Sequence, residues 1–258
     1  MAQVINTNLP SLNAQRNLST TQTQLAQSIQ RLSSGLRVNS AKDDAAGLAI
    51  AERMQAQVRG MNVAIRNAND GISMAQVAEG ALGKVSDILQ RMRELATQSA
   101  NGTYNDADRS NLDTEYQLLA DEIDRIFAST RFNGLAMLGA DAGSLVFQIG
   151  ANTGAENQVS VTSTRLDNAA ATTAVTGAAS EIGTAADSRT AMTNIDALLD
   201  IVTTERAKWG AVQNRFEAVI STLQVSAENQ EAARSRIMDA DFAKETAELT
   251  RAQILQQA

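Results

Sequence analysis

The fold of this chain is decided by residues 195–240, which read IDALLDIVTTERAKWGAVQNRFEAVISTLQVSAENQEAARSRIMDA. Apolar residues recur there on one alternating spacing of three and four positions, at Ile195, Leu198, Val202, Trp209, Val212, Phe216, Val219, Leu223, Ala233, Ile237 and Ala240. Only Glu205, Ser226 and Gln230 interrupt this register. Such a spacing, sustained over several heptads, keeps one face of a helix turned toward a partner helix. The stretch therefore predicts a long helix in a coiled coil or bundle.

The N-terminal region repeats this pattern, with apolar residues at Ile5, Leu9, Leu12, Leu18, Leu25, Ile29, Leu32 and Leu36. The step from Leu12 to Leu18 shifts the register by one position. Pro10 is the only proline of the chain. It is compatible with the first turn of a helix, where its missing N–H would form no helical bond. We expect a continuous apolar face from Ser11 onward.

Two further blocks, residues 65–96 and 112–126, also carry helical spacing. Between them, Asn101-Gly102 indicates a turn and Asn105-Asp106 a helix N-cap. We expect two antiparallel helices docked against the C-terminal one. A helix from Ile195 to Ile237 would be about 60 Å long, whereas a compact chain of this size has a radius of gyration of about 18 Å. The sequence thus predicts an elongated molecule.

Composition excludes several function classes. The net charge is -7 and Lys and Arg form no cluster, so we expect no nucleic-acid partner. Cys and His are both absent, which removes thiol nucleophiles, imidazole bases, disulfides and plausible zinc sites. The pairs Asp43-Asp44 and Asp121-Glu122 lie among alternating charges, which favours solvated or capping roles over catalysis. We expect no enzymatic activity, no cofactor and no metal.

The middle of the chain has a different composition. Residues 145–149 (LVFQI) and 158–162 (QVSVT) alternate like short strands around Asn152-Thr153-Gly154, which predicts a β-hairpin. From Asp167 to about Thr184 the chain is rich in Ala, Thr, Ser and Gly. Such a stretch buries little apolar area, so we expect a loop or a minimal cap there.

No targeting segment of the usual kind is visible. Residues 1–11 (MAQVINTNLPS) have neither a basic n-region nor an apolar h-region, and no apolar run has the length of a membrane span. By these rules we expect a cytoplasmic protein without membrane insertion.

Residues 30–51 read QRLSSGLRVNSAKDDAAGLAIA, and this segment closely resembles the signature segment of bacterial flagellins. Other segments resemble flagellin in the order found in that family: ISMAQVAEGAL (72–82), LQRMRELATQSANGTYN (89–105), EIDRI (122–126), FNG (132–134), GAVQNRFE (210–217) and ARSRIMDADFAKETAELTRAQILQQA (233–258). The resemblance therefore covers both ends and most of the chain.

This resemblance implies a mainly α fold: an elongated antiparallel helical bundle or coiled coil of N- and C-terminal segments, with a small β-hairpin region in the middle. Residues 1–43 and 239–258 would form a terminal coiled-coil core region. Residues 44–140 and 185–238 would form a helical rod domain, and residues 141–184 a β-hairpin and a reduced variable loop.

The resemblance also implies a structural subunit of the flagellar filament that serves motility. Export through the flagellar type III channel without a cleaved signal would place the protein outside the cell, which overturns the cytoplasmic expectation. Implied partners are other copies of the chain, a secretion chaperone, the export apparatus, and the filament cap and hook-junction proteins. The expected polymerisation seam comprises Leu12, Leu18, Leu25, Ile29, Leu32, Leu36, Ile237, Phe242, Leu249 and Ile254.

Two kinds of immune receptor are implied as further partners. In flagellins a Toll-like receptor docks on the helix that resembles residues 89–96, and the matching contacts are Gln90, Arg91, Leu95 and Glu115. Arg91 would supply a forked donor that a lysine could not imitate. From the pattern alone, Leu95 fits the bundle core better than a receptor contact, and the charged residues fit a solvated face better.

Plant flagellin receptors detect the segment that matches Gln30, Arg31, Leu32, Ser33, Ser34, Gly35, Leu36, Arg37, Val38, Asn39, Ser40, Ala41, Lys42, Asp43 and Asp44. Val38 stands where isoleucine is common. The same residues also suit a structural role. Gly35 and Asn39-Ser40 indicate a break between helices, and Asp43-Asp44 suits the start of the next helix, where carboxylates favour the helix dipole.

Flagellins usually continue beyond the ILQQA segment and end in an apolar tail. We therefore expect a shortened C-terminal partner for the N-terminal helix, which would affect polymerisation and chaperone binding. Two alternative functions stay open: a flagellin-like surface adhesin or binding protein, which would need a distinctive outward domain, and a hook-filament junction protein, which shares the terminal helices.

Overall fold

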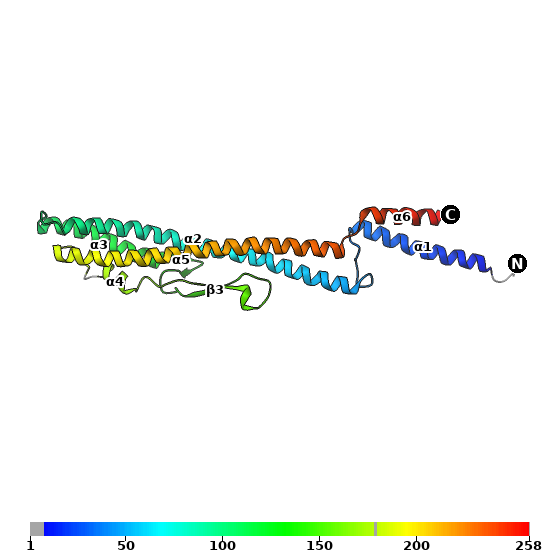
Figure 1. Cartoon of the computed structure of the whole chain (residues 1–258), viewed down its shortest axis with the longest axis horizontal. Coiled ribbons are helices and arrows are strands. Elements are labelled where there is room, and N and C mark those ends of the chain that lie inside the picture. The colour runs from blue at the N-terminus through cyan, green and yellow to red at the C-terminus, as the bar shows by residue number, and fades with distance from the viewer. Residues whose placement is uncertain (1–7, 178–179, 258) are drawn as a thin grey trace. The chain divides into compact units, whose positions relative to one another are not determined.

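The computed structural model describes residues 8–177 and 180–257. These residues form α1 (Leu9–Ser34), α2 (Ala45–Ser99), α3 (Asp106–Ser129), β1 (Arg131–Phe132), β2 (Leu135–Ala136), β3 (Ser144–Gln148), the 3-10 helix η1 (Ala155–Asn157), β4 (Gln158–Thr162), α4 (Ala170–Thr176), α5 (Ala185–Met238) and α6 (Phe242–Gln257) (Figure 1). The predicted mainly α fold with a small β region is confirmed. Residues 1–7, including Ile5, lie outside the described residues, as do 178, 179 and 258.

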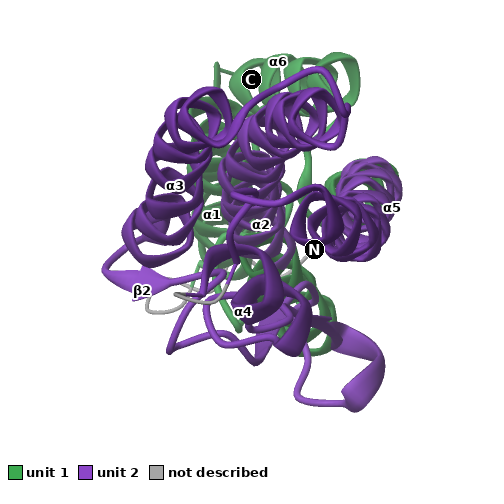
Figure 2. Cartoon of the chain, turned by 90° about the vertical axis from the view of Figure 1, so that its left-hand side faces the viewer, with its two compact units in different colours: residues 1–60, 225–258 green, residues 61–224 purple. Residues whose placement is uncertain are grey.

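The chain divides into two compact units (Figure 2). Unit 1 takes residues 1–60 and 225–258, and unit 2 takes residues 61–224. Each has a hydrophobic cluster of its own. The cluster of unit 1 is small and centres on Val38, Ala51 and Met238. The cluster of unit 2 contains most of the buried apolar side chains among the described residues.

Unit 2 is a bundle of long antiparallel helices. Two ion pairs join α2 to its neighbours: Arg91 lies 2.8 Å from Glu115 on α3, and Arg93 lies 2.7 Å from Asp196 on α5. The predicted heptad face of α5 is confirmed over its first half, where Ile195, Leu198, Val202, Trp209 and Phe216 are buried in the core. Further along the helix, Leu223 and Ile237 are only partly buried.

Helix ends follow the signals in the sequence. Asn105 caps α3 with a complete capping box, in which its side chain accepts from the Asp108 N–H and the Asp108 side chain accepts from the Asn105 N–H. The α1 helix begins with Asn8 as its N-cap and holds Pro10 in its first turn, as predicted. It ends at Gly35, whose φ of 70° lies in the left-handed region that glycine enters without strain.

The predicted β-hairpin is confirmed in unit 2. Strands β3 and β4 pair antiparallel, with Leu145 opposite Val161 and Phe147 opposite Val159. The hairpin docks on the bundle through the Phe147 ring, which meets the Phe216 ring of α5 edge to face at 5.3 Å.

One expectation for the middle of the chain is wrong. Residues 170–176, expected to be a loop or a minimal cap, form the short helix α4, which buries Val175. The chain that follows is anchored as well: the Ile182 N–H donates to Asp113 on α3 at 2.8 Å, and the Ile182 side chain is buried. The buried Val175 and Ile182 side chains, together with the bond from the Gln117 amide to the Ser180 carbonyl at 2.6 Å, dock this segment, although its composition is poor in large apolar residues.

Within the described residues, no helix combines the length and the apolar character that crossing a membrane requires.

Candidate assembly surface

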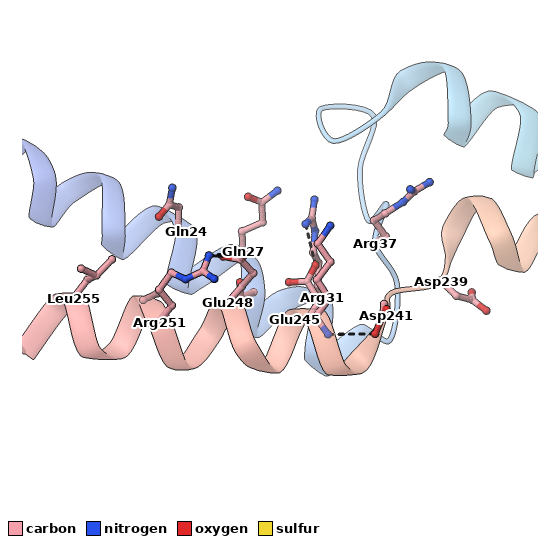
Figure 3. Close-up of a pocket in the computed structure, with 13 residues that line it drawn as sticks. Gln24, Gln27, Arg31, Arg37, Asp239, Asp241, Glu245, Glu248, Arg251 and Leu255 are labelled. Atoms are coloured by element: carbon pink, nitrogen blue, oxygen red, sulfur yellow. Dashed lines mark hydrogen bonds and ion pairs between the residues drawn. The ribbon is translucent and has the colours of Figure 1, made fainter.

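The terminal helices α1 and α6 lie side by side in unit 1 and run antiparallel (Figure 3). Asp241 starts α6 by accepting from the N–H groups of Ala243 and Lys244 at 3.0 and 3.2 Å, which satisfies two donors that a helix start leaves free. Small side chains face the partner helix, because Ser28 of α1 and Ala252 of α6 are both buried. Small residues let the two backbones approach closely.

One ion pair crosses this helix pair. The Arg31 guanidinium on α1 donates to the Glu245 carboxylate on α6 at 3.1 Å, and the Glu245 side chain is only 9% exposed (Figure 3). The buried Nε of Arg31 has no hydrogen-bond partner among the described residues. The pair fixes which turn of α6 lies beside the end of α1.

A polar groove of about 470 Å³ runs along the two helices around this pair. Its charges balance, because four basic and four acidic side chains line it: Arg31, Arg37, Lys244 and Arg251, and Asp239, Asp241, Glu245 and Glu248. Arg251 and Glu248 pair with each other at 3.2 Å. A groove with balanced charge offers no concentrated field for an anion or a cation.

The two junctions that lead into these helices are bonded to each other. Arg37 donates its backbone N–H to the Met238 carbonyl at 2.6 Å, and Ala240 donates to the Gly35 carbonyl at 2.9 Å. Leu36 and Asp239 form an isolated antiparallel bridge. The chain before α2 and the chain after α5 are therefore fixed side by side within unit 1.

The residues of the expected polymerisation seam do not close into one buried face in the isolated chain. Half of them are partly buried: Leu25, Leu32, Leu36, Ile237 and Leu249. The other half are exposed: Leu12, Leu18, Ile29, Phe242 and Ile254. The helical spacing alone missed Glu245 and Ser28, because a search for apolar periodicity passes over polar residues at contact positions.

The four residues matched to the Toll-like receptor contact separate into two groups. Gln90 and Arg91 are exposed, and Glu115 is partly buried. Glu115, and to a smaller extent Glu94, raise the pKa of the Arg91 guanidinium above its ordinary value through hydrogen bonds. Leu95 is 1% exposed and packs in the core of unit 2, so its side chain is not available at the surface of the isolated chain.

The segment matched to the plant-receptor epitope, residues 30–44, covers the end of α1 and the junction before α2. The predicted helix break at Gly35 and helix start at Asp44 are confirmed, since Asp44 accepts from the Gly47 N–H at 2.7 Å. Asp43 accepts from Asn39 and Ser40 in the junction. Val38 is buried against Met238 and Ala51.

The other carboxylate pair, Asp121-Glu122, lies on α3, where Glu122 forms an ion pair with Arg125 at 2.6 Å. The hydrogen bond from Arg125 lowers the pKa of Glu122. Among the described residues, no three of the acidic side chains gather in a way that could hold a metal ion.

Comparison with known proteins agrees with this architecture. Residues 5–142 match the model of the bacterial flagellin N-terminal helical region, and residues 192–258 match that of the bacterial flagellin C-terminal helical region. The chain is 46% identical over 255 residues to a flagellin of Halalkalibacterium halodurans, covering 99% of this chain and 92% of the relative.

A flagellar filament 31.3 kDa core protein of Treponema maltophilum is 39% identical over 273 residues, covering 99% of this chain and 93% of that protein. The crystal structure of Bacillus cereus flagellin is 33% identical, with a TM-score of 0.54, and the match covers 66% of this chain and 94% of that one. Two family models and relatives matched over nearly their whole length lead to one conclusion: the chain belongs to the bacterial flagellin family.

Proposed function

We propose that this chain builds the flagellar filament through its terminal helices, after export through the flagellar type III channel, and that the filament serves motility outside the cell. Membership of the flagellin family supports the coarser statement, a self-polymerising structural subunit of the flagellar filament. A secretion chaperone, the export apparatus, and the cap and hook-junction proteins are the further partners that this proposal requires.

The main support for assembly through the terminal helices is the exposure of their apolar side chains. Large apolar side chains on α1 and α6 are between 42% and 69% exposed: Leu9, Leu12, Leu18, Ile29, Phe242, Ile254 and Leu255. Exposed apolar side chains that gather on one pair of helices favour an interaction site there. Burial of each such side chain in an interface would contribute about 1.5 to 3 kcal/mol. Assembly of many copies is therefore the event that would remove this surface from water.

The proposal assigns a place in the filament to each region. Residues 1–43 and 239–258 form the inner core, residues 44–140 and 185–238 the surrounding rod, and residues 141–184 the outward face. Contact between two different faces of neighbouring copies is heterologous, and it gives an open helical filament when the rotation does not close.

Single substitutions can test the role of the terminal helices. Leu18→Gln replaces a leucine of α1 that is 42% exposed, and Leu118→Gln replaces a leucine of α3 in unit 2 that is 66% exposed and thus even more accessible. In this experiment, polymerisation is triggered by adding short filament fragments as seeds, together with sulfate, which strengthens apolar burial. Sedimentation and electron microscopy should then show slower growth and fewer filaments for Leu18→Gln only. Equal impairment by both substitutions would contradict a special role of α1, and intact chain that forms no filaments would favour an adhesin or junction protein.

We also propose that the surface around Arg91 is a Toll-like receptor contact. Gln90, Arg91 and Glu115 lie together at the surface, and the bonds from Arg91 to Glu115 and Glu94 hold the guanidinium in a defined position. Leu95 is left out of this proposal because of its burial. In a receptor reporter assay, Arg91→Ala should reduce signalling, whereas Arg125→Ala, at a similarly paired arginine on α3, should not. Equal signalling by both variants would refute this contact.

For plant receptors we propose residues 30–44 as the detected segment. The support is the resemblance of residues 30–51, together with the exposure of most side chains from Ser33 to Asp43. A synthetic peptide of residues 30–51 should elicit a response in plant tissue at low concentration. A peptide of the same composition in scrambled order is the control, and equal responses to both peptides would exclude sequence-specific detection.

A further inference from the structure

The turn between α2 and α3 holds an exposed Asn101-Gly102 pair in a reactive arrangement. The Asn101 side-chain oxygen accepts from the Thr103 N–H at 3.4 Å, so the asparagine side chain bonds to its own backbone two residues on. Such a bond limits the rotation of the side-chain amide and keeps it beside the backbone that contains the Gly102 nitrogen. We propose that Asn101 is a site of spontaneous deamidation, and that Arg109 directs the product toward isoaspartate.

Three features favour attack of the Gly102 nitrogen on the side-chain amide carbon of Asn101. Gly102 carries no side chain, and the space where a Cβ would stand is open. Among the described residues, no acceptor engages the Gly102 N–H. The Thr103 N–H already points at the oxygen that becomes negatively charged in the tetrahedral intermediate, and a donor in that position stabilises such an intermediate.

The reaction needs only water as a co-reactant. The Gly102 nitrogen forms a bond to Cγ of Asn101, and the amide nitrogen leaves as ammonia with the proton that Gly102 gives up. Water then adds to the cyclic imide and breaks one of its two C–N bonds. If the bond to Cγ breaks, residue 101 becomes aspartate. If the bond to the backbone carbonyl carbon breaks, the chain continues through the side chain as isoaspartate, with a free α-carboxylate.

Arg109 supplies the preference between the two products. Its side chain donates through Nη2 to the Asn101 carbonyl at 3.0 Å and to the Tyr104 carbonyl at 3.3 Å. Arg109 is only 7% exposed, its buried Nη1 has no hydrogen-bond partner, and no carboxylate within the described residues pairs with it. In isoaspartate the former Asn101 carbonyl is the free carboxylate. The buried cation would thus gain a charge-assisted bond where it already donates.

The chain contains a matched internal control. Asn133-Gly134 is the other Asn-Gly pair of the sequence and forms the two-residue turn between β1 and β2. Both of its residues have positive φ, 50° and 85°. The hairpin bonds hold this backbone, and among the described residues the Asn133 side chain has no bond to a following N–H comparable with that of Asn101. We therefore expect slower conversion at Asn133.

The test is an incubation of the full chain at mildly alkaline pH, followed by peptide mass spectrometry with fragmentation that separates isoaspartate from aspartate. One sample is folded and a second is unfolded in guanidinium chloride. We expect residue 101 to convert several-fold faster than residue 133 in the folded chain, and faster than in the unfolded chain. The substitution Gly102→Ala should slow conversion at residue 101, and its open site allows the fold to be kept.

The role of Arg109 has its own readout, the ratio of isoaspartate to aspartate. The substitution Arg109→Lys keeps the positive charge but removes the guanidinium group that donates to the Asn101 carbonyl. It should therefore lower this ratio toward that of the unfolded chain. A folded chain in which Asn101 converts no faster than Asn133 would overturn the proposed site. Faster conversion with the same product ratio in Arg109→Lys would overturn the directing role of Arg109, and circular dichroism checks that this variant folds.

Discussion

Glu245 is the side chain that connects the two terminal helices electrostatically. Its replacement by alanine would leave Arg31 half-buried and without its carboxylate partner, and the loss of one member of a buried pair is more harmful than the pair is stabilising. Because Arg31 keeps some contact with water, we expect a loss of about 2 kcal/mol in the docking of α6. Hydrogen exchange of the α6 amides measures this loss.

The exposed pair of Arg251 and Glu248 serves as the control for this prediction. Replacement of Glu248 by alanine should change the same exchange rates by less than about 0.5 kcal/mol. Equal effects of the two substitutions would mean that the burial of Glu245 has no energetic consequence.

Asp43 gives the junction before α2 a dependence on pH. The Asn39 N–H, and then the hydroxyl and N–H of Ser40, lower the pKa of this carboxyl below its ordinary value of 3.8. A carboxyl whose folded pKa is depressed contributes its stabilisation above the unfolded pKa and loses it as pH falls through the folded pKa. We therefore expect the junction to loosen below about pH 4.

An NMR titration can follow the Asn39 and Ser40 amide shifts against the Asp43 carboxylate shift. The substitution Asp43→Asn should abolish this transition. An unchanged transition in Asp43→Asn would assign the acid sensitivity to another group.

At the scale of the elements, Gly71 limits how closely α2 and α5 can pack. A Cβ on this residue would lie 2.6 Å from the ring of Phe216, which is fully buried and itself holds Phe147 of the hairpin. The substitution Gly71→Ala should destabilise the fold by about 1 to 3 kcal/mol, because the ring has little room to move. Urea unfolding measures this change.

Gly80 on the same helix provides the matched control, since no atom lies near its missing Cβ. Gly80→Ala should stabilise the fold by about 0.5 to 1 kcal/mol, as alanine restricts the unfolded chain and favours the helix. If both substitutions stabilise, the contact between Gly71 and Phe216 does not limit the packing.

The same elements indicate what a sequence can reveal. Apolar periodicity predicts the buried face of α5, since Trp209 and Phe216 obey one spacing. It cannot predict Glu205, which interrupts that spacing and is nevertheless buried, because its partners are Thr164, far away in sequence, and Lys208. Helix α4 was missed for a similar reason, since its docking depends on tertiary contacts and not on composition. In the candidate assembly surface, the spacing of apolar residues predicts the exposed leucines of α1. It does not predict the ion pair between Arg31 and Glu245.

At the scale of the whole molecule, the two units differ in the interactions that stabilise them. Unit 2 has an extended apolar core, whereas unit 1 combines a small cluster with one buried ion pair and a few junction bonds. Burial of apolar area is the main source of folding stability. The unit with the smaller core is thus also the one whose terminal helices α1 and α6 carry seven exposed large apolar side chains, which agrees with the proposal that other copies complete it.

The pairing of α1 with α6 also bears on the order in which the two units fold. Arg31 and Glu245 are 214 positions apart in sequence, and closing so long a loop costs about 5 kcal/mol of chain entropy. Pairing of α2 with α5 brings the distant segments together first, so unit 2 should gain protection before unit 1 when refolding is followed by pulsed hydrogen exchange. Simultaneous protection of both units would contradict this order. In the cell, α1 is synthesised about two hundred residues before α6, so through that interval the helix that it packs against is not yet present.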